Sequence, residues 1–187
     1  MGNAFDVAGM RGAVREERIS WQRHALERMM KRDIRRSDVL GVLQSGEMIE
    51  DYPTDRPFPS ALFLGRTGPR PLHVVVALDP VLVQIFVITA YEPDPEHFGA
   101  DSQNQEADMM KEDKPGACPL CGGNRGPGTT TFTAELGFGI VVVRNVPASI
   151  CSQCGADWIA DDAAARIEAL VDDARKNRRQ VEVTSLA

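Results

Sequence analysis

The sequence predicts an α+β fold, in which two helices pack on an antiparallel sheet and are followed by a small β-hairpin and a C-terminal helix. In the first half, helical periodicity is confined to residues 21–46 and strand-like runs fill residues 47–91, whereas all four cysteines follow residue 117. The hydrophobic fraction of 43% and the charged fraction of 26% exclude a disordered or fibrous chain. With 187 residues, the chain is long enough for one domain or two.

The first helix is expected over WQRHALERMMKR, with Ser20 as its N-cap. Its apolar side chains recur at four-residue spacing and form one stripe, as in a helix that packs on a sheet. A second helix is expected to begin at Ser37, to continue through DVLGVLQ and to end at Gly46, because glycine is a common helix stop.

Four strands are expected after the second helix, in the runs EMIEDY, SALFLGR, LHVVVAL and VLVQIFVITAY, with turns at RTGP and DP. The turn at Asp79–Pro80 leaves one question open. An even-length turn would place His73 and Thr89 on opposite faces of the sheet, whereas a three-residue turn would place them on the same face.

A polar segment at residues 92–117 separates the two halves of the chain. It contains three prolines and almost no apolar periodicity, which is linker composition. We therefore expect a first domain at residues 1–98, a linker at 99–115 and a second domain at 116–187. The tandem Met109–Met110 before a cysteine knuckle is typical of a protein start, so we interpret this segment as a junction between two former chains, natural or engineered.

The second half is expected to form a hairpin and a helix. The runs TTTFTAE and GIVVVRNVP are typical strands, joined around residues 136–139. The helix is expected over DDAAARIEALVDDARKNRR, where two aspartates at the start and two arginines at the end complement the helix dipole.

The cysteines form two knuckles, CPLCG and CSQCG. Two thiolates three residues apart on a tight turn reach one metal ion, and two such turns provide a tetrahedral zinc site without an open position, hence a structural one. The alternative is a pair of redox-active Cys-x-x-Cys motifs, but neither knuckle opens a helix within a βαβ pattern. The expected zinc ligands are Cys118, Cys121, Cys151 and Cys154.

Charge and hydropathy limit the function classes. A net charge of −6 argues against a chain that coats nucleic acid or membrane as a whole. The N-terminus lacks signal-peptide features and no segment approaches about 20 apolar residues, so we expect a cytoplasmic protein without a membrane partner. A local basic face is nevertheless present around the first helix. It comprises Arg23, Arg28, Lys31, Arg32, Arg35 and Arg36.

Five residues are candidates for catalysis. His24 and Arg28 share one face of the first helix, His73 begins a strand, and Thr89 and Tyr91 end the last strand. Metal-independent RNA cleavage needs a base, an acid and a cation for the phosphate, which two histidines and an arginine provide. Each residue also has a structural interpretation, since basic helix faces are commonly solvated and Thr and Tyr are common in strands. The expected RNA contacts are Arg23, Lys31, Arg32, Arg35 and Arg36.

The first half, from ISWQRHALERMMKRDIRRSDVLGVL through PLHVVVALDP to QIFVITAYEPDP, resembles the bacterial family called domain of unknown function 4258. That family is similar in layout to the RelE-like and MqsR-like toxin ribonucleases. The matching positions are His24 and Arg28 in "HAxERM", His73 in "LH", and Thr89 and Tyr91 in "TxY". The resemblance implies a RelE-like fold and an mRNA interferase-like ribonuclease that needs no metal.

The second half resembles the YgiT-type zinc finger of MqsA-type antitoxins, through CPLCGG, the two strands, CSQCGADW and the following helix. In such antitoxins the zinc domain contacts the toxin and a separate helix-turn-helix domain binds DNA. Only QVEVTSLA follows the last helix here, so we expect no DNA binding.

Together the two resemblances imply a toxin-like domain and its zinc-containing antitoxin-like partner on one polypeptide, inactive by default. The contact between them could form within one chain or between two chains, and a homodimer is compatible with both arrangements. The alternative is a non-enzymatic, zinc-containing interaction or regulatory module with a catalytically inactive toxin-like fold. The sequence leaves retention of catalysis open.

Overall fold

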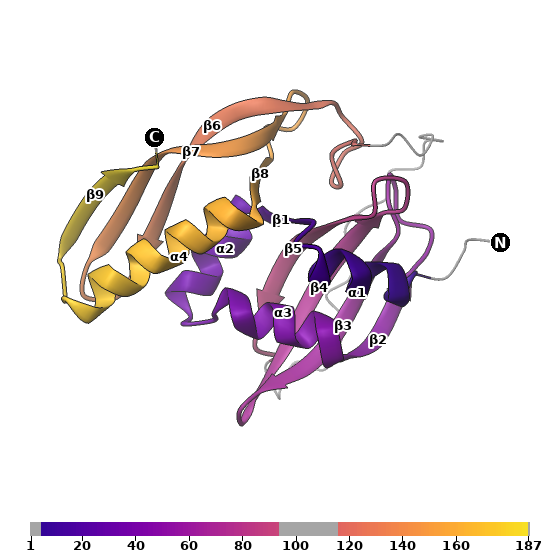
Figure 1. The fold of residues 1–187 in the computed structure, drawn as a ribbon, viewed down its shortest axis with the longest axis horizontal. Helices are drawn as coiled ribbons and strands as arrows, with labels where there is room; N and C mark the ends of the chain where they lie inside the picture. Colours follow the sequence, from indigo (N-terminus) through magenta and orange to yellow (C-terminus); the bar gives the residue numbers. More distant parts are fainter. Residues whose placement is uncertain (1–4, 94–115, 187) are drawn as a thin grey trace.

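A computed structural model describes residues 5–93 and 116–186, which contain four helices and nine strands. All nine strands belong to one mixed sheet, in the order β2-β3-β4-β5-β1-β8-β7-β6, with β9 paired to β7 (Figure 1). The expected linker at 99–115 and Met109–Met110 lie outside the described residues. Within the described ranges, no helix combines the length and the apolar character needed to cross a membrane.

The first half contributes three helices and five strands. Strands β2 to β5 form an antiparallel meander, whereas β1 pairs in parallel with β5. The helices α1, α2 and α3 cover one face of these strands (Figure 1). The elements are α1 (Val7–Arg15), β1 (Ile19–Gln22), α2 (Arg23–Lys31), α3 (Arg36–Ser45), β2 (Glu47–Tyr52), β3 (Ser60–Thr67), β4 (Arg70–Asp79) and β5 (Gln84–Tyr91).

The second half extends the same sheet. The expected hairpin is present as β6 and β7, and β8 pairs antiparallel with both β7 and β1, which joins the two halves. The expected helix is also present, and it lies beside α2 (Figure 1). The elements are β6 (Arg125–Glu135), β7 (Ile140–Cys151), β8 (Asp157–Ala160), α4 (Asp161–Lys176) and β9 (Val181–Ser185).

The predicted fold class is wrong. The structure is one large mixed sheet with four helices among the described residues, not two helices on an antiparallel sheet followed by a separate hairpin and helix. The segment ISWQ accounts for much of the difference, because it forms β1 between β5 and β8 and does not begin a helix. Gln22, not Ser20, caps α2, with its Oε1 accepting a hydrogen bond from the Ala25 amide at 2.8 Å.

Three further elements, α1, β8 and β9, were not predicted. Helix α1 begins after Asp6, whose carboxylate accepts a hydrogen bond from the Gly9 amide at 2.9 Å, and it buries Met10, Ala13 and Val14. Two glycines in its nine residues weaken its helical signal. Strand β9 is only five residues long. The second predicted helix is confirmed as α3, with Gly46 as its C-cap.

A β-bulge in β5, and not the length of the β4–β5 turn alone, decides whether His73 and Thr89 lie on the same face of the sheet. Asp79 pairs with Gln84, so the turn has an even length. Ile88 is an extra residue between the Val76–Val87 and Val75–Thr89 pairs, and it shifts the register by one. His73 therefore lies opposite Tyr91, and directly paired side chains share a face of the sheet.

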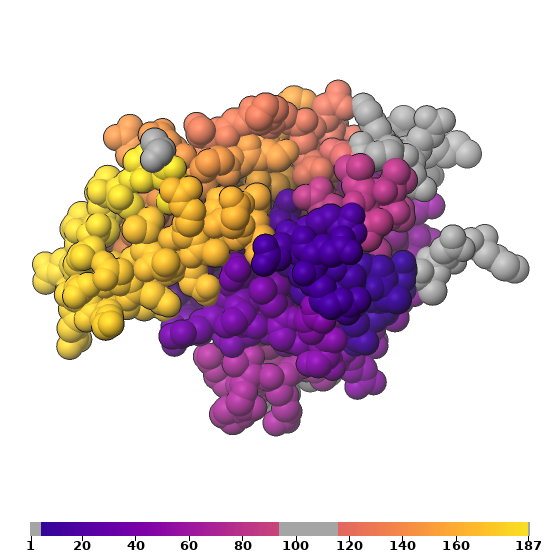
Figure 2. Space-filling model, in the orientation of Figure 1, coloured from indigo at the N-terminus to yellow at the C-terminus, as the bar shows by residue number. Residues whose placement is uncertain are grey.

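The sheet has apolar packing on both faces. The larger core fills the space between the sheet and the helices and includes Trp21, Met29, Val74 and Ile167. A smaller cluster on the other side contains Phe58, Ala77, Phe86 and Trp158 together with Cys118 and Cys151. In the space-filling view α4 lies directly against the first half (Figure 2).

Candidate functional site

The four cysteines come together at the base of the β6–β7 hairpin. Their sulfur atoms all lie within 4.8 Å of one another, with Cys118 3.8 Å from Cys154 and Cys121 3.5 Å from Cys151. The Gly123 amide donates to the Cys121 Sγ and the Gln153 amide to the Cys151 Sγ, both at 3.4 Å. Such amides orient and stabilise thiolate ligands, so this cluster could hold one metal ion.

The electrostatics of the cluster also fit a cation. Burial raises the pKa of Cys118. Burial opposes ionisation of Cys151 as well, but backbone hydrogen bonds outweigh it and lower the pKa of Cys151 to about 7. Four thiolates this close repel one another strongly, and a divalent ion among them removes that repulsion.

The cysteine cluster rests against the first half of the chain. Phe86 of β5 stacks on Phe58 at 5.9 Å and meets Trp158 edge-to-face at 5.2 Å, between ring centroids. The Arg125 guanidinium lies 4.5 Å from the centroid of the Phe86 ring. The buried Asp79 carboxylate accepts a hydrogen bond from the Gly116 amide, two residues before Cys118, at 2.8 Å. Ordering the knuckles therefore also orders their contact with β4 and β5.

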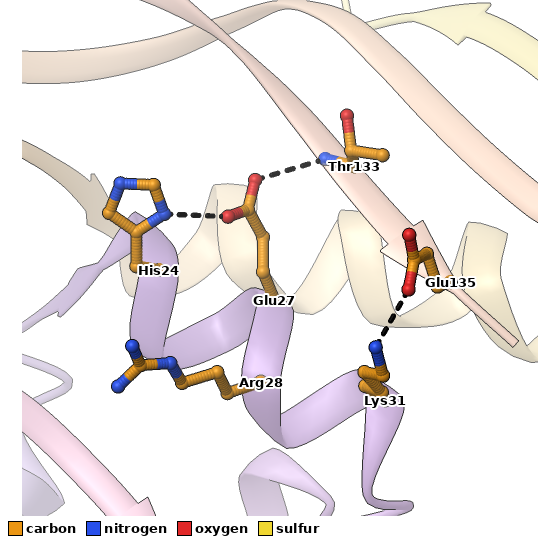
Figure 3. Close-up of a pocket in the computed structure, with 6 residues that line it drawn as sticks. All are labelled: His24, Glu27, Arg28, Lys31, Thr133 and Glu135. Atoms are coloured by element: carbon orange, nitrogen blue, oxygen red, sulfur yellow. Dashed lines mark hydrogen bonds and ion pairs between the residues drawn. The ribbon is translucent and has the colours of Figure 1, made fainter.

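A second cluster surrounds His24 on α2 (Figure 3). The His24 Nδ1 lies 2.9 Å from the Glu27 Oε2, and the Glu27 Oε1 accepts from the Arg23 Nη1 at 2.8 Å and from the Thr133 amide of β6 at 3.2 Å. Glu27 thus holds the imidazole in one orientation and ties α2 to the second half. A cavity of about 270 Å³ lies here, lined by His24, Glu27, Arg28, Lys31, Thr133 and Glu135.

The sequence did not identify Glu27 as a functional residue, because it was counted only as a negative charge within a basic face. Its spacing from His24 was the available signal, since residues three apart on a helix are neighbours.

Acidic residues of the second half meet the basic face of the first. The Asp157 Oδ2 accepts from the Arg23 Nε at 2.5 Å, and the Glu135 Oε2 from the Lys31 Nζ at 2.7 Å. The Arg36 Nε donates to the Asp161 Oδ1 at 3.0 Å, and the Arg36 amide to the Glu168 Oε1 at 2.8 Å. Three of the six basic side chains predicted for this face are thereby paired across the two halves.

The other three basic side chains are exposed. Arg28 lines the cavity beside His24, whereas Arg32 and Arg35 lie at and beyond the end of α2. None of the three makes an ion pair with another residue in the part of the chain that the structure describes.

His73 and Tyr91 form a third cluster. The His73 Nδ1 lies 3.3 Å from the Tyr91 hydroxyl, and their rings meet edge-to-face with centroids 5.3 Å apart. Burial lowers the pKa of His73, against the opposing effect of the Glu50 charge. Burial raises the pKa of Tyr91, and Glu50 adds to that rise. Thr89 is half-buried on the same face of β5, two residues before Tyr91.

The two histidines lie on opposite sides of the sheet. Leu72 and Val74, the neighbours of His73, belong to the core beneath the helices, so the His73 side chain points to the other face. His24 is on α2, which covers the helical face. The structure therefore brings His73 together with Tyr91 and Thr89, and His24 together with Arg23, Glu27 and Arg28, but it does not bring the two groups into one cavity.

Comparison with known families agrees with the first resemblance. Residues 21–92 match the family described as Domain of unknown function (DUF4258). The DUF4258 match runs from the middle of β1 to just beyond β5 and contains both the His24 and the His73 clusters. No curated protein and no solved structure matches the chain. The resemblance of the second half to YgiT-type zinc fingers stays a prediction.

Proposed function

We propose that this chain is a self-neutralised toxin–antitoxin protein, in which a ribonuclease of the DUF4258 region is held inactive by a zinc-binding second half. One observation supports it above the others: carboxylates of the second half pair with Arg23, Lys31 and Arg36 of the basic face. RNA affinity depends on Lys and Arg contacts to phosphates. A cation already paired with a carboxylate cannot supply that contact.

The pairs differ in how completely they would exclude RNA. The Arg23 side chain is 22% exposed and that of Asp157 8%, so this pair is mostly removed from solvent. The Lys31–Glu135 pair is exposed at both ends and is easily exchanged for another anion. The inhibition we propose at the His24 cavity therefore depends mainly on Asp157, while the exposed pair of Glu135 adds to it more weakly.

In the proposed chemistry, His24 is the general base that takes the proton of the RNA 2′-hydroxyl. The 2′-oxygen then bonds to the phosphorus, the P–O5′ bond breaks, and the departing 5′-oxygen takes a proton from water. Glu27 positions its imidazole through Nδ1, and Nε2, which lies 3.2 Å from the Arg23 Nη2, would exchange that contact for the substrate hydroxyl. Arg28, beside the same cavity, would stabilise the charge that develops on the phosphate. The His73, Thr89 and Tyr91 cluster lies on the other face of the sheet and takes no part in this proposed step.

The ion in the cysteine cluster is proposed to be zinc, since four thiolates favour zinc over hard cations such as magnesium. With four protein ligands it would be structural. It would hold both knuckles in the conformation that packs on Phe86.

The test uses the full chain. The double variant Glu135→Gln/Asp157→Asn removes two carboxylates from the basic face, and Asp173→Asn/Glu182→Gln removes two that pair with Arg179 within the second half. We expect the first variant, but not the control or the parent, to cleave RNA in magnesium-free buffer, and His24→Ala to abolish that cleavage. A folded first variant that cleaves no RNA, or a His24→Ala variant that cleaves as fast, would contradict the proposal.

The second candidate function is a non-enzymatic interaction module. It is favoured by the separation of the two histidines on opposite faces, which deprives the His24 site of a second histidine as general acid. In that case the Glu135→Gln/Asp157→Asn variant would bind RNA more tightly than the parent but leave it intact.

A further inference from the structure

Cys154 differs from the other three cysteines of the cluster in its exposure. Cys118 and Cys151 are buried and Cys121 is intermediate, whereas Cys154 is exposed. The Cys154 Sγ nevertheless lies 3.8 Å from the Cys118 Sγ, and all four sulfurs lie within 4.8 Å of one another. A small oxidant in the solvent therefore meets the Cys154 sulfur first, with a second sulfur already within reach. Exposure beside a second cysteine is the usual setting of an oxidisable cysteine.

The closest sulfur contacts connect the two knuckles to each other. Cys118 of the first knuckle meets Cys154 of the second at 3.8 Å, and Cys121 meets Cys151 at 3.5 Å. A small movement of the side chains brings such a contact to the length of a disulfide bond. Oxidation at Cys154 would therefore join the first knuckle to the second.

Both knuckles are closed turns, which fixes the backbone on either side of the Cys118–Cys154 contact. The Cys118 amide donates to the Gly123 carbonyl at 2.9 Å, and the Cys151 amide donates to the Ala156 carbonyl at 2.9 Å. A bond between the two sulfurs is therefore compatible with the backbone of both turns.

We propose that Cys154 is a site of oxidation by peroxides and that Cys118 converts the oxidised sulfur into a disulfide. In the first step the Cys154 thiolate attacks a peroxide oxygen, the O–O bond breaks, and a sulfenic acid forms. In the second step the Cys118 thiolate attacks the Cys154 sulfur and the S–O bond breaks. Each step releases hydroxide, which takes up a proton. The two cysteines lose two electrons in total, and one hydrogen peroxide is reduced to two waters.

The disulfide would replace the ion as the connection between the knuckles. The thiolate is the metal ligand, so an ion that loses Cys118 and Cys154 keeps only two of its four ligands and is released. This release rests on the zinc site proposed above, whereas formation of the disulfide does not. Cys118 packs with Phe86 and Trp158 in the smaller apolar cluster, so a bond to Cys118 keeps the second knuckle beside that cluster. Loss of the ion under reducing conditions leaves neither connection.

The experiment treats the zinc-loaded full chain with one equivalent of hydrogen peroxide. A chromogenic chelator measures the released zinc, and peptide mass spectrometry after blocking of free thiols locates the disulfide. Trypsin cuts after Arg125 and Arg144, between the knuckles, so a bond from one knuckle to the other joins two peptides. We expect zinc release in proportion to a Cys118–Cys154 peptide pair. The urea midpoint of the oxidised chain should exceed that of the reduced chain after chelation.

Two matched variants test the role of exposure. Cys154→Ser and Cys118→Ser each remove one ligand and leave three thiols, but only Cys118→Ser keeps the exposed sulfur. In metal-free buffer, peroxide should consume thiols several-fold more slowly in Cys154→Ser than in Cys118→Ser, and circular dichroism checks that both variants are folded.

A measurement on the parent chain needs no variant. Dimedone, which traps sulfenic acids, should label Cys154 before any other cysteine during brief exposure to peroxide. First labelling elsewhere, pairing of Cys154 with a different cysteine, or an oxidised chain no more stable than the reduced metal-free chain would each overturn the proposal. RNA cleavage is not measured, and a parent that binds no zinc would refute the proposed ion while the peptide map still decides the oxidation.

Discussion

Asp161 connects the two halves at the start of α4, and its removal should destabilise the whole protein. The carboxylate is buried, and it accepts hydrogen bonds from the Trp21 Nε1 at 2.7 Å, the Arg36 Nε at 3.0 Å and the Arg36 Nη2 at 3.3 Å. Asp161→Ala leaves the indole N–H of a fully buried tryptophan without this acceptor and leaves Arg36 without its closest counter-charge.

The magnitude follows from burial. An unsatisfied buried donor costs about 1–3 kcal/mol, and breaking a buried ion pair costs about 3–5 kcal/mol. The Arg36 side chain is 19% exposed and keeps Glu168 at 4.0 Å, so water and Glu168 compensate part of the loss. We expect Asp161→Ala to lower the free energy of unfolding by about 3 kcal/mol, and Asp161→Asn, which keeps an acceptor for Trp21, by about 1–2 kcal/mol.

Urea unfolding of the full chain, followed by tryptophan fluorescence, measures this change. Asp162→Ala is the matched control, because Asp162 is the next residue in the same helix turn but is exposed. Loss of its interaction with the helix dipole should lower stability by only about 0.3–1 kcal/mol. If Asp161→Ala is no more destabilising than Asp162→Ala, the hydrogen-bonded contact between the halves does not stabilise the fold as argued.

Two further predictions concern the metal and pH. Cys121→Ser should abolish metal binding, which elemental analysis measures. It should also lower the urea midpoint of unfolding, because knuckles without an ion lose their ordered packing on Phe86. An unchanged midpoint would contradict this expectation. Burial lowers the pKa of His73, so the folded chain binds fewer protons than the unfolded chain. The free energy of unfolding should therefore fall as pH drops from about 6.5 through the folded-state pKa. His73→Gln should flatten this dependence, and a slope equal to that of the parent would refute the assignment.

The elements that the sequence predicted correctly carry their signals locally. Helix α3 ends at a glycine, and α4 has aspartates in its first turn and basic residues in its last. The β6–β7 hairpin was predicted from the strand-forming runs TTTFTAE and GIVVVRNVP, which lie largely within the two strands. Such signals depend on neighbours a few residues away, so they can be read from a single sequence.

The errors concern features that depend on distant residues. The segment ISWQ forms a strand because β5 and β8 lie on either side of it, and β8 begins more than a hundred residues later. The hydrogen bond between Trp21 and Asp161 spans 140 positions. Likewise, the bulge at Ile88 has no signature in its own residue type, although it decides which side chains share a face with His73.

The candidate sites also differ in whether they depend on neighbouring or on distant residues. The cysteine cluster follows from spacing alone, because each knuckle fixes two sulfurs locally. The basic face was recognised from composition, but its pairing with acidic residues of the second half was not, since nothing near Asp157 or Asp161 indicates a partner on α2 or α3. To predict that His24 and His73 lie on opposite sides of the sheet, one would need both the strand register and the helix positions, and neither can be read from the sequence.

The second half pairs with the first half at β1 and also contacts it on both faces of the sheet. These contacts limit how the proposed ribonuclease could be regulated. Strand β8 adds to the edge at β1, the cysteine cluster packs on Phe86 on one face, and α4 meets α2 and α3 on the other. RNA could compete with the carboxylates on the helical face, but it has no access to the contact at Phe86. Competition by RNA alone would therefore leave the second half attached, whereas loss of the ion would loosen the contact at Phe86, which RNA cannot reach. If the proposed inhibition operates, cleavage by the full chain should depend more strongly on metal occupancy than on RNA concentration.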